Sequence, residues 1–398
     1  MHHLFRAARL SRAPSLALMA VGVFWGAFAA YIPDIKARIG AADGAFGMAL
    51  MMAAAGSIVS MQLAPRVLAR FGRATMPAAG ALAALAALSP LAAGDTPGLG
   101  AALFFMGASI AMIDITANIR LSVEEEVQGL HLMNLCHAAF SFAFALAAFA
   151  AAQARQAGWP PEAFLPLSAL AILALGLCTH EGAGWRTAPP SPEGAGRSEG
   201  LLRAVLPVAI ILFLAFICEN ATDSWSALHI ERTLGAGAGF GGYGPAMLGL
   251  TMGIGRLGGQ VAAQRLGEAT LIFGSALVGV FGAIVTAIAW APGIGILGVA
   301  LIGVGVAVMV PSSNTILGRL VRPDQRGLAL SRAWIFGFAG FFIGPSLMGQ
   351  VSAAFGLRWS FGCVAVLLAA ILPVVLQLRR LESRRPSAVG IQEAVRQQ

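Results

Sequence analysis

Three acidic side chains lie inside long apolar stretches of this sequence: Asp114, Glu219 and Asp223. A carboxylate inside a bilayer costs free energy, so such a residue is rarely kept without a function. A carboxyl group that binds a proton on one side of a membrane and releases it on the other can couple a proton gradient to solute movement. We therefore interpret Asp114 and Glu219 as candidates for proton coupling.

Two further polar residues accompany Asp114. Asn118 follows it by one helical turn, and His137 stands near the start of the next apolar stretch. Because a short loop joins the two stretches, we expect His137 to lie near Asp114, where an imidazole can share the proton. The alternatives are that Asp114 only hydrogen-bonds neighbouring helices and that His137 is a packed histidine with its hydrogen bonds satisfied.

The residues around the second pair of acids suit a hydroxylated solute. Glu219 and Asp223 are four residues apart and share one helix face. Amides and acids can bind hydroxyl groups, and an aromatic ring can cover the C–H face of a sugar. The predicted substrate-binding residues are Trp25, Asn118, Glu219, Asn220, Asp223, Trp225 and Asn314. For Trp225 the aromatic belt at the membrane surface is an alternative, and for Trp25 the alternative is packing.

The composition indicates the elements that must position these residues. Hydrophobic residues make up 58% and charged residues 11% of the 398 residues, whereas soluble proteins have about 25% charged residues. Runs of about 20 apolar residues can each cross a bilayer as a helix. We predict an all-α membrane protein with twelve transmembrane helices near 14–34, 44–65, 75–94, 98–119, 132–153, 163–179, 204–226, 243–263, 269–291, 293–315, 331–354 and 359–378.

The net charge of +8 is distributed as a topology signal. With the N-terminus inside, 21 of the 26 Lys and Arg residues fall in inner segments. This excess of positive charge predicts that both termini are cytoplasmic, in a bacterial inner membrane, and it needs no nucleic-acid partner. The first span is interpreted as an uncleaved helix and not as a signal peptide. The five outer cations are Lys36, Arg38, Arg155, Arg232 and Arg358.

The chain contains two copies of one unit. Arg70-Phe-Gly72 recurs as Arg265-Leu-Gly267 at an offset of 195, and Asn118 corresponds to Asn314 at an offset of 196. This repetition predicts two pseudo-symmetric six-helix bundles joined by a linker rich in Pro, Gly and Ser. The predicted parts are an N-terminal bundle (1–179), a cytoplasmic linker (180–203), a C-terminal bundle (204–380) and a cytoplasmic tail (381–398).

This organisation resembles the major facilitator superfamily. The turn Arg70-x-Gly72-Arg73 follows the second span, and Gly253-Ile-Gly-Arg256 resembles its counterpart in the second half. The resemblance implies a substrate site between the bundles, alternating access and a monomer. It also implies that a set of loop residues controls the conformational change, and these are Arg70, Gly72, Arg73, Arg256 and Arg265. Ala69 stands where the family has an acid, which is expected to weaken this latch.

Asp114-x-x-x-Asn118 is similar to the L-fucose–proton symporter group, in which a glutamate of the same span carries the coupling proton. The chain looks closer still to an uncharacterised bacterial inner-membrane branch, which shares Glu219-x5-Trp225 and His137. These resemblances imply proton-coupled transport of a small polar solute such as a sugar. The implied partners are the solute, protons and membrane lipids, with no cofactor and no metal.

The sequence is compatible with other functions. Drug-exporting antiporters carry Gly-x-x-x-Gly-Pro in the fifth span, but here that motif falls in the eleventh, at 340–345. His131, Met133, Cys136 and His137 are soft ligands that suit copper(I), which keeps a metal importer as an alternative. A sensor or assembly factor that transports nothing is a third alternative. An enzyme is not expected, because no nucleophile–base set or phosphate loop is evident.

Overall fold

The structure is a computed structural model that describes residues 9–128, 132–182, 201–322 and 325–383. Within these ranges the chain is helical and has no strand. Most of the predicted linker (183–200) and of the predicted tail (384–398) lies outside the described residues. The main helices are α2 (Arg12–Arg38), α3 (Asp43–Phe71), α4 (Thr75–Ala86), α5 (Thr96–Gln128), α6 (Met133–Gln156), α7 (Pro161–Leu177), α8 (Leu201–Leu228), α9 (Tyr243–Leu266), α10 (Glu268–Ile288), α11 (Pro292–Ala307), α12 (Met309–Leu320), α13 (Arg326–Phe355) and α14 (Leu357–Ser383).

Each of the twelve predicted spans is helical. In the described part of the chain, nine helical stretches are long and apolar enough to cross a membrane by length and composition. One of them, Asp43–Ala92, contains both α3 and α4. The 17-residue α7 and the glycine-rich α9 supply the sixth and eighth predicted spans. The tenth span is interrupted at Val308, between α11 and α12.

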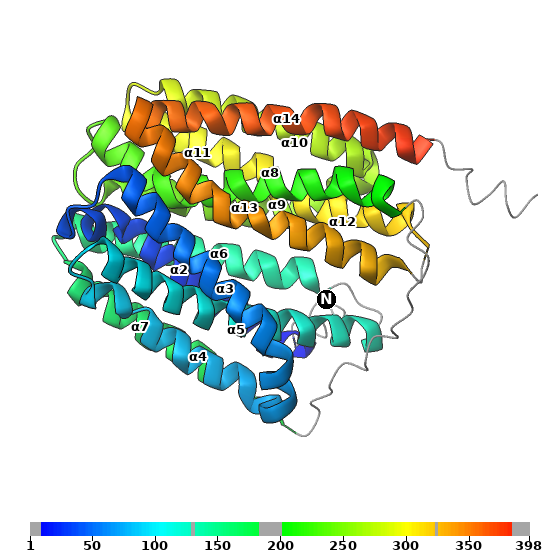
Figure 1. The fold of residues 1–398 in the computed structure, drawn as a ribbon, viewed down its shortest axis with the longest axis horizontal. Helices are drawn as coiled ribbons and strands as arrows, with labels where there is room; N and C mark the ends of the chain where they lie inside the picture. The colour runs from blue at the N-terminus through cyan, green and yellow to red at the C-terminus, as the bar shows by residue number, and fades with distance from the viewer. Residues whose placement is uncertain (1–8, 129–131, 183–200, 323–324, 384–398) are drawn as a thin grey trace, which may run out of the picture.

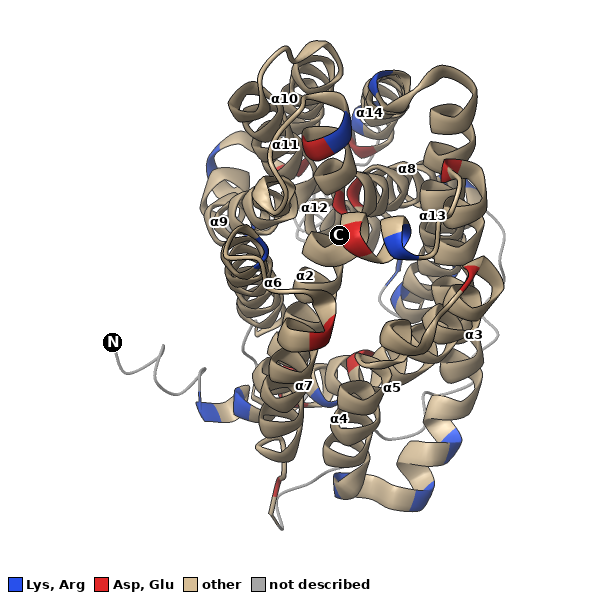
Figure 2. Cartoon of the chain, turned by 90° about the vertical axis from the view of Figure 1, so that its left-hand side faces the viewer, with Lys and Arg blue, Asp and Glu red and all other residues tan. Residues whose placement is uncertain are grey.

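The helices form an elongated bundle in two groups, with α2–α7 in the lower part and α8–α14 in the upper part of Figure 1. One end of the bundle holds the last turns of α2, α6 and α8, and we call it the paired end because ion pairs join helices there. Figure 2 looks onto this end and shows acidic and basic segments near the junction of the two groups. The opposite end holds the last turns of α3, α9 and α12, and we call it the arginine-rich end.

Two glycines that match in the sequence repeat each end a helix. Gly72 and Gly267 terminate α3 and α9, with φ of 51° and 79°. Their backbone N–H groups cap the helices by donating to the carbonyls of Leu68 and Ala263. Only glycine adopts such a positive φ without strain, so each glycine can end its helix after the second and the eighth predicted span.

The two groups of helices approach closely where α3 meets α13. A Cβ atom on Gly349 would lie 2.6 Å from the carbonyl oxygen of Asp43 and 3.0 Å from the Cα of Gly47. A Cβ on Gly47 would in turn lie 2.7 Å from the carbonyl oxygen of Pro345. Small residues allow membrane helices to pack backbone against backbone, so this glycine pair brings the two halves together at the paired end.

We expect Gly349→Ala to lower the melting temperature of the purified protein, because overpacking a contact of this kind costs about 1–3 kcal/mol. Gly274→Ala in α10 is the matched control, since a Cβ there meets no atom within 4 Å. Alanine stabilises a helix interior by roughly 0.5–1 kcal/mol relative to glycine, so the control should melt no lower than the wild type. Equal melting temperatures for the two variants would contradict this packing.

Candidate functional site

Asp114, Asn118 and His137 are brought together by α5 and α6. Asn118 lies one helical turn after Asp114, and its Nδ2 donates to Asp114 Oδ1 at 3.1 Å and to the Asp114 carbonyl oxygen at 2.9 Å. Its Oδ1 lies 3.2 Å from Nε2 of His137 on α6. The expected proximity of His137 and Asp114 is thus mediated by the Asn118 amide, which contacts both.

Arg256 links the two halves of the protein in the middle of α9. Its guanidinium donates to Ser141 Oγ at 2.5 Å and to the His137 carbonyl oxygen at 3.4 Å, both on α6. It also donates to Glu219 Oε1 on α8 at 3.4 Å, and it lies 6.0 Å from the centroid of the Phe140 ring. The assignment of Arg256 to an inner loop is therefore wrong, because the residue lies within a helix and its contacts hold it between α6, α8 and α9.

Five charged or polar residues consequently form one connected set, which we call the polar chain: Asp114, Asn118, His137, Arg256 and Glu219. The first three come from the N-terminal half and the last two from the C-terminal half. Arg256 joins the two parts of the set through the backbone carbonyl oxygen of His137 and the carboxylate of Glu219.

The other polar residues of α8 adjoin this chain. Asp223 lies one turn beyond Glu219, and its Oδ1 is buried without a hydrogen-bond partner among the described residues. Asn220 Oδ1 accepts a hydrogen bond from Ser224 Oγ at 3.4 Å. A buried carboxylate oxygen without a donor is costly unless a proton or ligand reaches it.

Trp25 and Asn314 have their described contacts outside the polar chain. The half-buried Trp25 ring lies 5.2 Å from the ring of Phe24 and 6.0 Å from that of Phe28, all on α2. Asn314 on α12 accepts a hydrogen bond from Trp334 Nε1 on α13 at 3.2 Å. Both residues are partly accessible, but the contacts of each stay within its own half.

Trp225 is an internal residue of the boundary between the halves. Its side chain is 0% exposed, and its ring lies 5.8 Å from that of Phe46 on α3 in an edge-on arrangement. Its Cζ2 atom also lies 3.2 Å from the Cβ position of Gly349 on α13. The alternative that Trp225 belongs to the membrane-surface aromatic belt is wrong, because helices of both halves enclose it.

The loop residues predicted to control the conformational change lie at the arginine-rich end. Arg70 and Arg73 are exposed around the Gly72 turn, and Arg265 is exposed in the last turn of α9. None of these three arginines forms an ion pair with another residue in the part of the chain that the structure describes.

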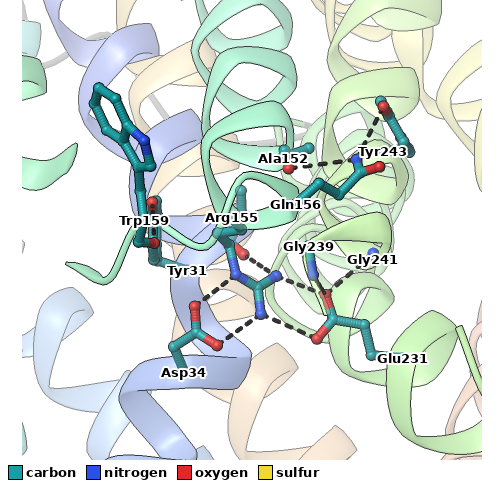
Figure 3. Close-up of polar contacts among 11 residues, drawn as sticks. Tyr31, Asp34, Ala152, Arg155, Gln156, Trp159, Glu231, Gly239, Gly241 and Tyr243 are labelled. Atoms are coloured by element: carbon teal, nitrogen blue, oxygen red, sulfur yellow. Dashed lines mark hydrogen bonds and ion pairs between the residues drawn. The ribbon is translucent and has the colours of Figure 1, made fainter. Parts of the chain in front are cut away.

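At the paired end, Arg155 joins the two halves through two carboxylates (Figure 3). Its Nε and Nη2 donate to Asp34 on α2 at 2.6 and 2.8 Å. Its Nη1 and Nη2 donate to Glu231, after α8, at 2.6 and 3.0 Å, and Nη1 also donates to the Ala30 carbonyl oxygen at 2.8 Å. The residue is 5% exposed, so a buried guanidinium with every nitrogen bonded spans the boundary.

Glu231 is held in place by local backbone geometry. It lies in the π-helical turn His229–Thr233 that ends α8. Its Oε1 also accepts from the backbone N–H groups of Gly239 and Gly241, at 3.0 and 3.1 Å (Figure 3). Turns of this kind occur often at functional sites, and here the turn directs the carboxylate toward Arg155.

A second ion-pair cluster lies beside the first at the paired end. Asp43, at the start of α3, pairs with Lys36 Nζ at 3.0 Å and accepts from Arg232 Nη1 at 2.7 Å. Its other oxygen accepts from Arg232 Nη2 and from Ser352 Oγ of α13. Asp43 therefore binds two groups of the C-terminal half, Arg232 after α8 and Ser352 on α13.

Neither cluster was predicted from the sequence, although a signal for them was present. Lys36, Arg155 and Arg232 are three of the five cations assigned to the outer side, where cations are the minority. Acidic residues stand near the same span ends, at Asp34, Asp43 and Glu231. Matching the outer cations with outer acids would have indicated ion pairs, but the partners are up to 189 positions apart in the chain.

The described residues include no group of three or more His, Cys, Asp or Glu side chains arranged to hold a metal. His131, which belongs to the cluster of soft ligands before α6, lies outside the described residues. Of the other members, Cys136 is buried and its thiol lies 3.2 Å from Ser15 Oγ.

The sequence of this chain matches a known protein family. The family model described as Major Facilitator Superfamily matches residues 15–316 and 270–397. The chain belongs to this superfamily. An uncharacterized MFS-type transporter of Yersinia pestis is 28% identical over 365 residues, covering 89% of this chain and 92% of that protein. The protein is therefore a multi-pass membrane transporter of the bacterial MFS type.

Solved structures show the same fold. A bacterial homolog of the human lysosomal transporter Spinster, in an inward-facing and unoccupied conformation, superposes with a TM-score of 0.77 at 11% identity, covering 96% of this chain and 99% of that one. A D-xylose–proton symporter superposes with a TM-score of 0.68 at 16% identity, covering 91% and 96%. These similarities confirm the all-helical major facilitator fold.

Proposed function

We propose that this MFS transporter is a proton-coupled secondary carrier of a small polar solute. The observation that carries the proposal is the polar chain, in which Asp114, Asn118 and His137 of one half reach Arg256 and Glu219 of the other. Charged groups in the membrane interior are costly and generally functional. Movement of one half against the other would make and break these contacts. Such changes would alter the affinity of the carboxyl groups for a proton, which couples the proton to the movement.

The proposed organisation assigns one body to residues 1–179 and the other to 204–380. Residues 180–203 and 381–398 are the proposed linker and tail. We place the arginine-rich end in the cytoplasm of a bacterium and the paired end in the periplasm, since cytoplasmic loops carry the excess of Lys and Arg. On this assignment the ion pairs of Arg155 and Asp43 close the periplasmic side.

We propose that Asp114 carries the coupling proton, as the similarity of Asp114-x-x-x-Asn118 to the L-fucose–proton symporter group suggests. The proposed substrate site uses Asn220, Asp223 and the polar chain. It also includes Trp25 from the N-terminal half and Asn314 from the C-terminal half. Antiport efflux would use the same carboxylates, and the direction of proton movement distinguishes it from symport.

Uptake into proteoliposomes tests the proposal. Solutes that raise the melting temperature of the purified protein should accumulate above the external concentration when the vesicle interior is alkaline. With equal pH on both sides they should only equilibrate. Identical accumulation under both conditions would contradict proton coupling, and absence of any uptake would favour a sensor or assembly factor.

The proposed topology predicts the reactivity of a single cysteine in the linker. Ser191→Cys, introduced after the four native cysteines are replaced, should not react with a membrane-impermeant maleimide added to intact cells. It should react after the inner membrane is opened. Modification from outside the intact cell would contradict the cytoplasmic placement of 180–203.

A further inference from the structure

Among the described residues, Arg155, Arg232 and Arg256 bond across the boundary between the halves, and the hydrogen bonding of Arg155 and Arg256 differs most. Arg155 has all three side-chain nitrogens bonded to carboxylates or a carbonyl, at 2.6–3.0 Å. Arg256 meets its only described carboxylate, Glu219, at 3.4 Å through a single oxygen, and its Nε has no described partner. A guanidinium presents five N–H donors in a fork that matches a carboxylate. Arg155 is saturated, whereas Arg256 keeps donors available.

The surroundings of Arg256 suit an incoming ligand. Its side chain is 14% exposed and that of Glu219 is 18% exposed, deep within helices of the membrane bundle. Ser141 Oγ and the face of the Phe140 ring hold the guanidinium from the α6 side. The guanidinium is thus held by α6 contacts and is mostly buried, with 14% of the side chain accessible, and a low-dielectric environment strengthens an ionic contact.

We infer that the transported solute carries a carboxylate that pairs with Arg256 and displaces the long contact to Glu219; this inference rests on the proposed transport function. Asn220 follows Glu219 directly in α8, and its Oδ1 accepts a hydrogen bond from Ser224 Oγ at 3.4 Å. Its Nδ2 group can donate to a hydroxyl group, so the substrate class is a small hydroxylated carboxylic acid. A neutral sugar would leave the spare donors of Arg256 without a charged partner.

The charge balance of the site connects this anion to the proton. The titratable and charged groups around Arg256 are Glu219 and Asp223 on α8, His137 on α6 and, through Asn118, Asp114 on α5. A substrate carboxylate would bring a further negative charge toward a single guanidinium. The substrate carboxylate and the ionised carboxylates of the site would repel one another strongly in a medium of low dielectric constant. A proton that neutralises one of them removes this repulsion, so a proton enters with the anion.

Matched pairs of probes test the inference with the full-length purified protein. D-gluconate differs from D-sorbitol, and D-glycerate from glycerol, only by a carboxylate in place of a hydroxymethyl group. With ionic strength balanced by sodium chloride, the acid of at least one pair should raise the melting temperature, and its neutral partner should not. Equal stabilisation by both members, or by the neutral members alone, overturns the inference.

Variants of Arg256 give an independent measure. Arg256→Gln should weaken binding of the acid at least about tenfold, as expected for loss of a hydrogen-bonded charge. Arg256→Lys should weaken it less, because lysine keeps the charge without the two-pronged geometry. Arg66→Gln, an exposed arginine bonded to the Gln62 carbonyl oxygen of its own helix at 3.2 Å, should bind as the wild type does. Unchanged affinity in Arg256→Gln overturns the inference.

Uptake of the same probes separates this inference from the transport function. If a pH gradient drives accumulation of the neutral members and not of the acids, transport stands and the anion assignment is wrong. If neither class binds or accumulates, both proposals fall. Accumulation of an acid that is lost in Arg256→Gln supports both.

Discussion

Asp114→Asn should abolish accumulation of the substrate under a pH gradient while keeping exchange of substrate between two equilibrated compartments. Asparagine resembles the protonated carboxyl in shape, and Asn118 can still hydrogen-bond to it in place of Asp114 Oδ1, the acceptor at 3.1 Å. Exchange needs no net proton movement, so only the driven step should be lost. Initial rates of both processes in proteoliposomes check this expectation.

Glu162→Gln is the matched control for this substitution, because Glu162 is a half-exposed acid at the surface that pairs with Arg38. It should accumulate substrate as the wild type does. His137→Ala should move the pH optimum more than it weakens binding, since His137 contacts Asn118 and not the carboxylate itself. Full gradient-driven accumulation in Asp114→Asn would transfer the coupling role to Glu219.

Arg155→Gln should open the paired end. Removing one partner of a buried ion pair costs about 3–5 kcal/mol, and here it leaves Asp34 and Glu231 facing each other across the boundary. A change of about 3 kcal/mol is enough to bring a 99:1 equilibrium close to equal populations. The free-energy difference that favours the conformation closed at this end should therefore largely disappear.

Cross-linking across the boundary measures this opening. Gln153 and Tyr243 come from opposite halves and are hydrogen-bonded at 2.5 Å, so cysteines at these positions should be joined by a short bifunctional reagent. The yield should fall severalfold in Arg155→Gln. Arg38→Gln, which removes an ion pair within one half, should retain it. An unchanged yield in Arg155→Gln, with the protein still monodisperse, would show that other contacts close this end.

The fold could be predicted from the sequence because it depends on local patterns. Apolar runs predicted the membrane helices, and Gly72 and Gly267 lie where α3 and α9 end. Asp114 and Asn118 are four positions apart, so they share a helix face, and in the structure they are hydrogen-bonded. These signals are contained in short segments, so no knowledge of how the helices pack was needed.

The contacts between halves could not be predicted in the same way. Arg256 was interpreted as a loop residue because its motif resembles a loop signature, and its contacts with Ser141 and Glu219 depend on how α6, α8 and α9 meet. Trp225 near a span end is compatible with the aromatic belt until the packing of α3 against α13 encloses it. The contacts of these two residues depend on how the helices pack together and not on residue type or spacing.

The most direct test of the central claim, that a proton moves with the substrate, is the internal pH of proteoliposomes loaded with a pH-sensitive dye. With no gradient imposed, a stabilising solute is added outside, and the initial change of internal pH is followed in the wild type and in Asp114→Asn. Proton-coupled symport predicts acidification of the interior in the wild type and none in Asp114→Asn. Substrate entry in the wild type without any change of internal pH would contradict the account, and alkalinisation would identify an antiporter.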